Sequence, residues 1–132
     1  MDELAQKWLD LAEGDLEAAE TLFENPKSQR SYQIAVHHCH QAVEKLLKMM
    51  IVLTGREVAK IHDLSRLLEL LDESLPGKLV DYIDELNPHY NVPRYLDLPS
   101  MGPSFTYDNK AARYHVEKSK ELFIWVKKKY SM

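Results

Sequence analysis

The sequence has little of what marks several classes of protein. It contains a single cysteine, Cys39, which excludes an internal disulfide framework and a zinc site built from several thiolates. Its 132 residues carry a formal net charge of −4, so no global basic field draws the surface onto duplex nucleic acid or anionic membrane. Any contact with nucleic acid must therefore be local.

Long hydrophobic runs are also missing. The longest, MMIVL at 49–53, is far too short to span a bilayer, and the first residues, MDELAQKWLDLAEG, have no basic region like that of a secretory signal. We therefore expect a soluble, cytoplasmic protein without membrane contact. An apolar content of 45% in a chain of this length is enough for one core, so we expect a single domain over residues 1–132.

The hydrophobic pattern predicts helices along most of the chain, and no segment shows the alternation of a strand. Apolar residues at spacings of three and four predict helices over residues 2–24, 31–54, 64–71 and 77–86. Asp108 is placed to cap a last helix. The apolar stripe of that helix comprises Ala112, His115, Val116, Ser119, Leu122, Phe123 and Val126.

Long helices joined by short turns pack as antiparallel neighbours. The expected fold is all-α: an up-and-down antiparallel four-helix bundle with a short extra helix. Residues 46–53 are almost all apolar, so a helix here has hardly any polar face. We therefore expect this part of the second helix to lie at the centre of the bundle or at a subunit interface. The proline-rich segment of about twenty residues before the last helix is too apolar for a disordered tether, so we expect a long ordered loop there.

This loop carries the first candidate binding residues. The stretch NPHYNVPRYLDLP, residues 87–99, places Arg94 between Tyr90 and Tyr95. An arginine fork can hold phosphate, and flanking aromatic rings can stack on a base or a ribose. In the structural alternative, Arg94 pairs with Asp15 inside the bundle and the two tyrosines plug its end. The residues alone leave both interpretations open.

Asp15 falls on the apolar stripe of the first helix, where an unpaired carboxylate is costly. Its candidate partners are Lys45 on the second helix and Arg94 in the loop, and we count Asp15 and Lys45 among the candidate ligand-binding residues. The alternative is a half-exposed carboxylate at the edge of the stripe.

Two further patterns could support chemistry. The run HHCH places His37 and His40 one turn apart with Glu44 four residues on, a spacing that suits metal ligands, although such histidines more often form a solvated or dimer-facing edge. Arg56 and His62 suit phosphodiester chemistry, because the arginine can stabilise phosphorane charge while the histidine moves a proton. Without a nucleophile or a second base they do not define a site, and both also fit structural roles. We expect no cofactor.

Several stretches together resemble the HEPN domain family (higher eukaryotes and prokaryotes nucleotide-binding) over nearly the whole chain. They are DLAEGDLEAAETL in the first helix, HHCHQAVEKLL in the second, a glycine followed by an HDL turn, and YNVPRYLD before the last helix. The resemblance implies an antiparallel helical bundle, often a homodimer, paired in prokaryotes with a minimal nucleotidyltransferase in toxin–antitoxin-like systems. It also implies two types of member. Some are RNases with an arginine followed shortly by a histidine late in the domain, and others bind nucleotide or the partner enzyme.

The sequence departs from the RNase type where that motif is expected. Arg94 is followed by YLDLPSM, without a histidine, and Arg56 and His62 have the right spacing but lie where the HDL turn is expected. We therefore expect a non-catalytic HEPN-type module that binds a nucleotide-type ligand or a nucleotidyltransferase partner through the Arg94 loop. The alternatives are a metal-independent RNase that uses Arg56 and His62 in a homodimer, and a purely architectural protein-interaction module. RNA stays open as a ligand, although the net charge does not favour it.

Overall fold

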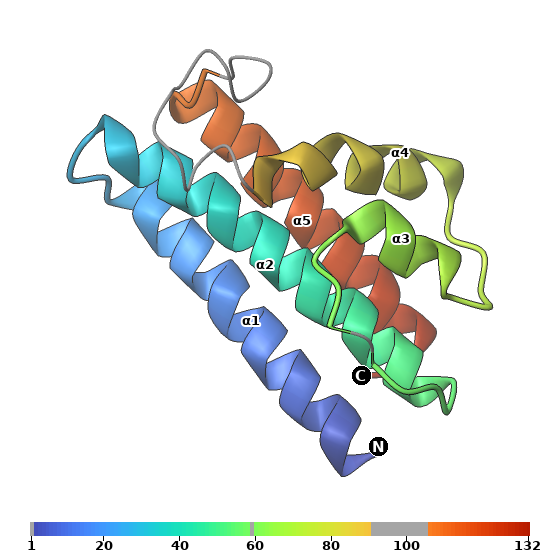
Figure 1. Ribbon diagram of the computed structural model, residues 1–132. Coiled ribbons are helices and arrows are strands. Elements are labelled where there is room, and N and C mark those ends of the chain that lie inside the picture. The colour runs from blue at the N-terminus through green and yellow to red at the C-terminus, as the bar shows by residue number, and fades with distance from the viewer. Residues whose placement is uncertain (1, 59, 91–105) are drawn as a thin grey trace.

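The computed structural model describes residues 2–58, 60–90 and 106–132 (Figure 1). These residues form helices and no strand, so the predicted all-α class is confirmed. The elements in chain order are α1 (Glu3–Glu24), α2 (Gln29–Leu53), α3 (Leu64–Glu69), α4 (Gly77–Leu86), the 3₁₀ helix η1 (Asn87–Tyr90) and α5 (Asn109–Lys129).

α2 is the central element. α1 packs along it in the opposite direction, α5 follows it in the same direction, and the short helices α3 and α4 lie on another side (Figure 1). The up-and-down topology of a four-helix bundle stays a prediction. Among the described residues, no helix is both long and apolar enough to cross a membrane.

The helices begin and end close to the places that the sequence indicates. Asp2, Asp63 and Asp108 each accept a hydrogen bond from a backbone N–H of the first helical turn, at 2.7, 3.2 and 2.8 Å. Gly55, with φ of +83°, follows the end of α2 in the left-handed conformation that glycine adopts without strain. α2 begins at Gln29, two residues before the predicted start.

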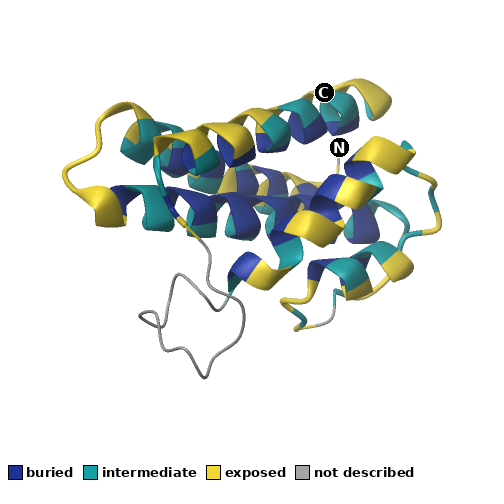
Figure 2. Ribbon diagram, turned by 90° about the horizontal axis from the view of Figure 1, so that it is seen from above, coloured by how far each residue is buried: buried dark blue, intermediate teal, exposed yellow. Residues whose placement is uncertain are grey.

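The core lies against α2. Leu46, Leu47, Met49 and Met50 are 0% exposed, which confirms that the second half of this helix is covered on several sides. All seven predicted stripe residues of α5 are buried as well. Figure 2 shows the buried residues on the inner faces of the helices and the exposed ones outside.

The prediction of a loop before the last helix is wrong for its first four residues. Residues 87–90 form η1, which continues directly from α4. Pro88 is compatible with this turn. The first N–H groups of a helix have no hydrogen-bond acceptor within it, and proline has no N–H group that would need one. Residues 91–105, with Arg94 and Tyr95, lie outside the described residues, so the ordered loop stays a prediction.

Candidate functional site

Asp15 of α1 lies in a polar network with two residues of α2. Its carboxylate accepts a hydrogen bond from Lys45 Nζ and lies 3.1 Å from His38 Nδ1, which donates when this nitrogen carries the proton. Burial by itself raises the pKa of Asp15, but hydrogen bonds from His38 and Lys45 outweigh it and hold the pKa below its usual value. Of the two partners predicted for Asp15, the structure therefore supplies Lys45 and adds His38.

A second network centres on the buried carboxylate of Glu44. Lys48 Nζ donates to it at 3.0 Å, and His62 Nδ1 lies 3.1 Å from both of its oxygens. The Lys48 ammonium also lies 5.5 Å from the centre of the Trp8 ring, a cation–π contact. Glu44 is thus fully engaged, and it fixes the orientation of the His62 imidazole.

His62 carries a stacked aromatic ring. Tyr90, the last residue of η1, lies parallel to the His62 imidazole with 4.9 Å between ring centres and 10° between ring planes. The side chain of His62 is 55% exposed, whereas Glu44 beneath it is 8% exposed. The stack therefore presents a flat, anchored ring to solvent. We call these two residues the His62–Tyr90 stack.

Two histidines of α2 flank this stack. The rings of His37 and His40 lie 6.3 and 5.4 Å from that of Tyr90, and His37 lies 6.3 Å from His38. His37 therefore links the Asp15 network to the His62–Tyr90 stack across the surface of α2.

His40 lies beneath this surface and is fully buried. No described residue makes a well-aligned hydrogen bond to either ring nitrogen, although the nearby Asn87 amide weakly favours the protonated ring. Burial, followed by the nearby His37 and His89, lowers the pKa of His40 to about 3. The ring is neutral at physiological pH and acts as part of the core.

The candidate metal ligands do not assemble a site in the described part of the chain. His37, His40 and Glu44 share α2, but the Glu44 carboxylate is occupied by Lys48 and His62. No group of three or more His, Cys, Asp or Glu side chains among these residues is arranged to hold a metal ion.

Arg56 and His62, the candidate catalytic pair, make contacts with different parts of the chain. Arg56 donates to the carbonyl oxygen of Leu70 and to Asp72, both at 2.7 Å, and so ties the end of α2 to the end of α3. His62 instead turns to Glu44. The structure does not bring the two side chains together, and neither helps the other toward phosphodiester chemistry.

Sequence reasoning missed a buried network around α5. Tyr82 Oη lies 3.0 Å from His115 Nδ1 and 3.1 Å from Ser119 Oγ. The His115 and His89 ring centres are 4.8 Å apart, and His89 Nδ1 lies 2.8 Å from the Tyr107 hydroxyl. The stripe pattern predicts that His115 and Ser119 are buried, but their partners come from distant segments, which local spacing does not reveal.

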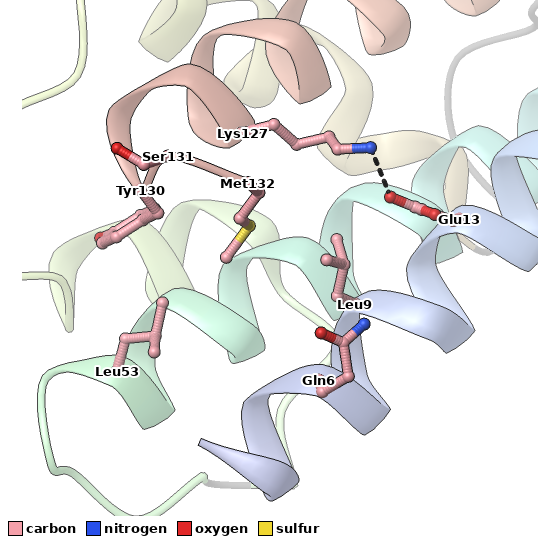
Figure 3. Close-up of a pocket in the computed structure, with 8 residues that line it drawn as sticks. All are labelled: Gln6, Leu9, Glu13, Leu53, Lys127, Tyr130, Ser131 and Met132. Carbon is pink, nitrogen blue, oxygen red and sulfur yellow. Dashed lines mark hydrogen bonds and ion pairs between the residues drawn. The ribbon is translucent and has the colours of Figure 1, made fainter. Parts of the chain in front are cut away.

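A pocket of about 550 Å³ lies where the first half of α1 and the last residue of α2 meet the C-terminal end of the chain (Figure 3). Gln6 and Leu9 of α1, Leu53 of α2 and Tyr130 after α5 contribute to its lining, and Lys127 reaches Glu13 across its edge at 2.8 Å. None of the candidate residues from the sequence lies in it.

Arg94 and Tyr95 lie outside the described residues. The structure therefore places three of the five candidate ligand-binding residues, Asp15, Lys45 and Tyr90, which lie around the described surface of α2 and η1. Glu44 and His62, which the sequence singled out for other roles, join Tyr90 there.

Comparisons with known proteins identify the family. Residues 5–129 match the HEPN domain. A crystal structure of TT1696 from Thermus thermophilus is similar, with a TM-score of 0.78 and 26% sequence identity over 95% of this chain and 97% of that one. No curated protein matches the sequence. Because the family match covers almost the whole chain, the chain belongs to the HEPN domain family.

Proposed function

We propose that this HEPN chain is a non-catalytic module that binds a nucleotide-type ligand beside the His62–Tyr90 stack. The observation that supports the proposal is the stack itself, in which a half-exposed imidazole is backed by a parallel tyrosine and anchored by a buried carboxylate. Because these rings are already held in place, a base that stacks on them orders few additional groups.

The proposal assigns the phosphate to Arg94, which follows Tyr90 by four residues in the sequence. The nearby lysines of α2 are engaged, since Lys45 pairs with Asp15 and Lys48 with Glu44. A phosphate bound here needs a further cation, and a guanidinium fork suits its oxygens.

Calorimetric titration of the full chain with ATP and with AMP tests the proposal. We expect Tyr90→Ala and Arg94→Ala each to weaken binding by about tenfold or more, because Tyr90 backs the imidazole on which the base stacks, and base–aromatic stacking contributes about 1–3 kcal/mol. Tyr114→Ala is the matched tyrosine control, because this half-exposed residue bonds to Glu85. Arg56→Ala is the matched arginine control. Unchanged affinity in both Tyr90→Ala and Arg94→Ala, or no binding of either nucleotide, contradicts the proposal.

The proposed protein partner is a minimal nucleotidyltransferase, in a toxin–antitoxin-like pair. Membership of the HEPN family supports a nucleotide-related role of this kind. Coexpression with such an enzyme should yield a complex that the Arg94→Ala chain no longer forms. A complex that forms equally well with Arg94→Ala and takes up no nucleotide favours the purely architectural module.

One observation favours a second candidate, an RNase-like activity. Glu44 holds Nδ1 of the exposed His62, the arrangement that orients an imidazole for proton transfer through its other nitrogen. Arg56 is not the accompanying cation, because Asp72 and the Leu70 carbonyl hold it. Cleavage of single-stranded RNA by the pure protein that His62→Gln abolishes would establish this activity, and uncut RNA would exclude it.

A further inference from the structure

One side of α1 faces solvent. The helix lies at the edge of the molecule (Figure 1), and its inner side packs through Ala5, Leu9, Ala12, Leu16 and Ala19. Ion pairs tie one flank to α2, through Asp15 and Lys45, and the other flank to α5, through Glu13 and Lys127. The side of α1 opposite the buried residues is therefore left without a neighbouring helix in the described chain.

The solvent-facing side of α1 repeats every seven residues. Leu4 and Leu11 are both 53% exposed, and Ala18 follows at the same spacing. Together with the residues midway between them they form a row, which we call the α1 seam: Leu4, Lys7, Leu11, Gly14, Ala18 and Thr21. Alternating steps of three and four residues are the spacing at which one helix meets another in a coiled coil.

An acidic row runs beside the α1 seam. It comprises Glu3, Asp10, Glu17 and Glu24, again seven residues apart. All four side chains are exposed, and none of them forms an ion pair with another described residue. In a pair of helices, the charged residues that flank the central row select the partner and its direction. This flank of the seam therefore favours a helix with a basic edge.

Gly14 is a residue of the α1 seam that packing within the described chain does not explain. A glycine inside a helix weakens it, because glycine loses the most conformational freedom on folding. A Cβ atom at Gly14 would meet no described atom within 4 Å, so no neighbour requires the small side chain. Glycine also lets another backbone approach closely. With Ala18 and Thr21 after it, Gly14 leaves room for a second helix.

We propose that the α1 seam binds a helix of another protein, one that carries lysine or arginine beside its own apolar row. A second copy of this chain is a poorer match. Two antiparallel α1 helices would place their acidic rows opposite each other. Two parallel ones would place each acidic row opposite Trp8, Asp15 and Leu22, none of which is basic. The acidic row also opposes an anionic membrane.

The size of the α1 seam predicts a weak contact. A helix of 22 residues is about 30 Å long and about 10 Å wide, so a partner helix covers roughly 300 Å² of it. The two partners together bury roughly 600 Å², which is below the range of stable interfaces and typical of transient ones. We therefore expect micromolar or weaker affinity, with a clear dependence on salt.

Binding of a synthetic helical peptide to the full chain tests the proposal. The peptide is about three heptads long, with leucine along its seam, lysine on both flanks and alanine elsewhere. A control peptide has glutamate in place of every lysine. Fluorescence anisotropy of the labelled lysine peptide should show binding that weakens by about fivefold or more between about 0.05 M and about 0.5 M salt. The glutamate peptide should not bind.

Variants of the chain locate the contact. Leu11→Gln should weaken peptide binding by about tenfold, because it removes a leucine from the centre of the contact. Tyr114→Gln is its control, since this exposed residue of α5 bonds to Glu85. Glu17→Lys should weaken binding by about fivefold. Asp81→Lys makes the same change of charge on α4, across α2 from α1 (Figure 1), and should alter affinity less than about twofold.

A further variant keeps the proposal falsifiable if Leu11→Gln disturbs folding, which circular dichroism would show. Gly14→Gln should weaken peptide binding by about fivefold or more, because its side chain would stand between the two helices. In the free chain the same change replaces a residue that weakens the helix, so the melting temperature should stay the same or rise.

The results that overturn the proposal are distinct from these. One is a lysine peptide that does not bind. Another is an equal loss of affinity in Glu17→Lys and Asp81→Lys, since the attraction would then be diffuse. A third is a wild-type chain that sediments as a dimer and that Leu11→Gln separates, since a second copy would then occupy the α1 seam.

Discussion

Glu44 is a buried carboxylate that ties α2 to the segment before α3. It lies on α2, holds Lys48 one turn later and orients His62 from the segment before α3. Because Glu44 and Lys48 are both buried, each needs the other to offset the loss of water around its charge.

Replacing Glu44 by Gln should therefore lower the free energy of unfolding by about 3 kcal/mol, because Lys48 would stay buried without a counter-charge. Urea denaturation at neutral pH measures the change. Asp72→Asn is the control, since it removes an exposed partner of Arg56 and should cost less than about 1 kcal/mol. Equal losses in the two variants would contradict this role of Glu44.

The sequence predicts the contact partners of individual polar residues only in part. The spacing of α1 identifies Asp15 as a carboxylate that needs a partner, and Lys45 follows from the charges available on α2. His38 and the Glu44–His62 pair could not be predicted in the same way. Their partners lie 23 and 18 residues apart in the sequence, and only the packing of α1 and of the segment before α3 against α2 brings them together.

At the scale of the element, α5 depends on its N-terminal cap. Asp108 Oδ1 accepts the hydrogen bond of the Ala111 N–H, which otherwise has no partner inside the helix. Asp108→Ala should therefore cost about 1 kcal/mol in thermal or urea denaturation. Lys110→Ala, in the exposed first turn, should change stability by less than about 0.5 kcal/mol. If Asp108→Ala is as mild as Lys110→Ala, the cap does not stabilise the helix.

Helices with a clear apolar stripe and a capping residue are the elements that the sequence predicts best. In α5 both the cap and every stripe residue agree with the structure. η1 is different, because Pro88 signals only that a regular helix cannot continue. Whether the chain then turns into a loop or a 3₁₀ helix depends on tertiary contacts such as the stack of Tyr90 on His62.

At the scale of the whole molecule, three buried histidines should make the fold sensitive to acid. Burial lowers the pKa of His40 to about 3 and that of His89 to about 4, and burial together with nearby His89 lowers that of His115 to about 3. In the unfolded chain each imidazole has a pKa of about 6.5. The unfolded state therefore binds more protons below that pH, so stability is present above it and is lost as the pH falls toward about 4.

With three such groups, the free energy of unfolding should fall by up to about 4 kcal/mol per pH unit in this window. Urea denaturation between about pH 7 and about pH 5 measures the slope. His40→Leu removes one of the three imidazoles that take up a proton on unfolding, and it should reduce the slope by about 1.4 kcal/mol per pH unit. A slope that is flat in the wild type, or unchanged in His40→Leu, would contradict this account of acid sensitivity.

The central claim is that a nucleotide binds beside the His62–Tyr90 stack, and a crystal structure of the protein with ATP tests it most directly. We predict density for the base against the exposed face of the His62 ring, with the phosphates at Arg94. ATP bound only elsewhere, such as in the pocket beside Tyr130, or a map without ATP at concentrations that saturate binding in solution, would contradict the claim.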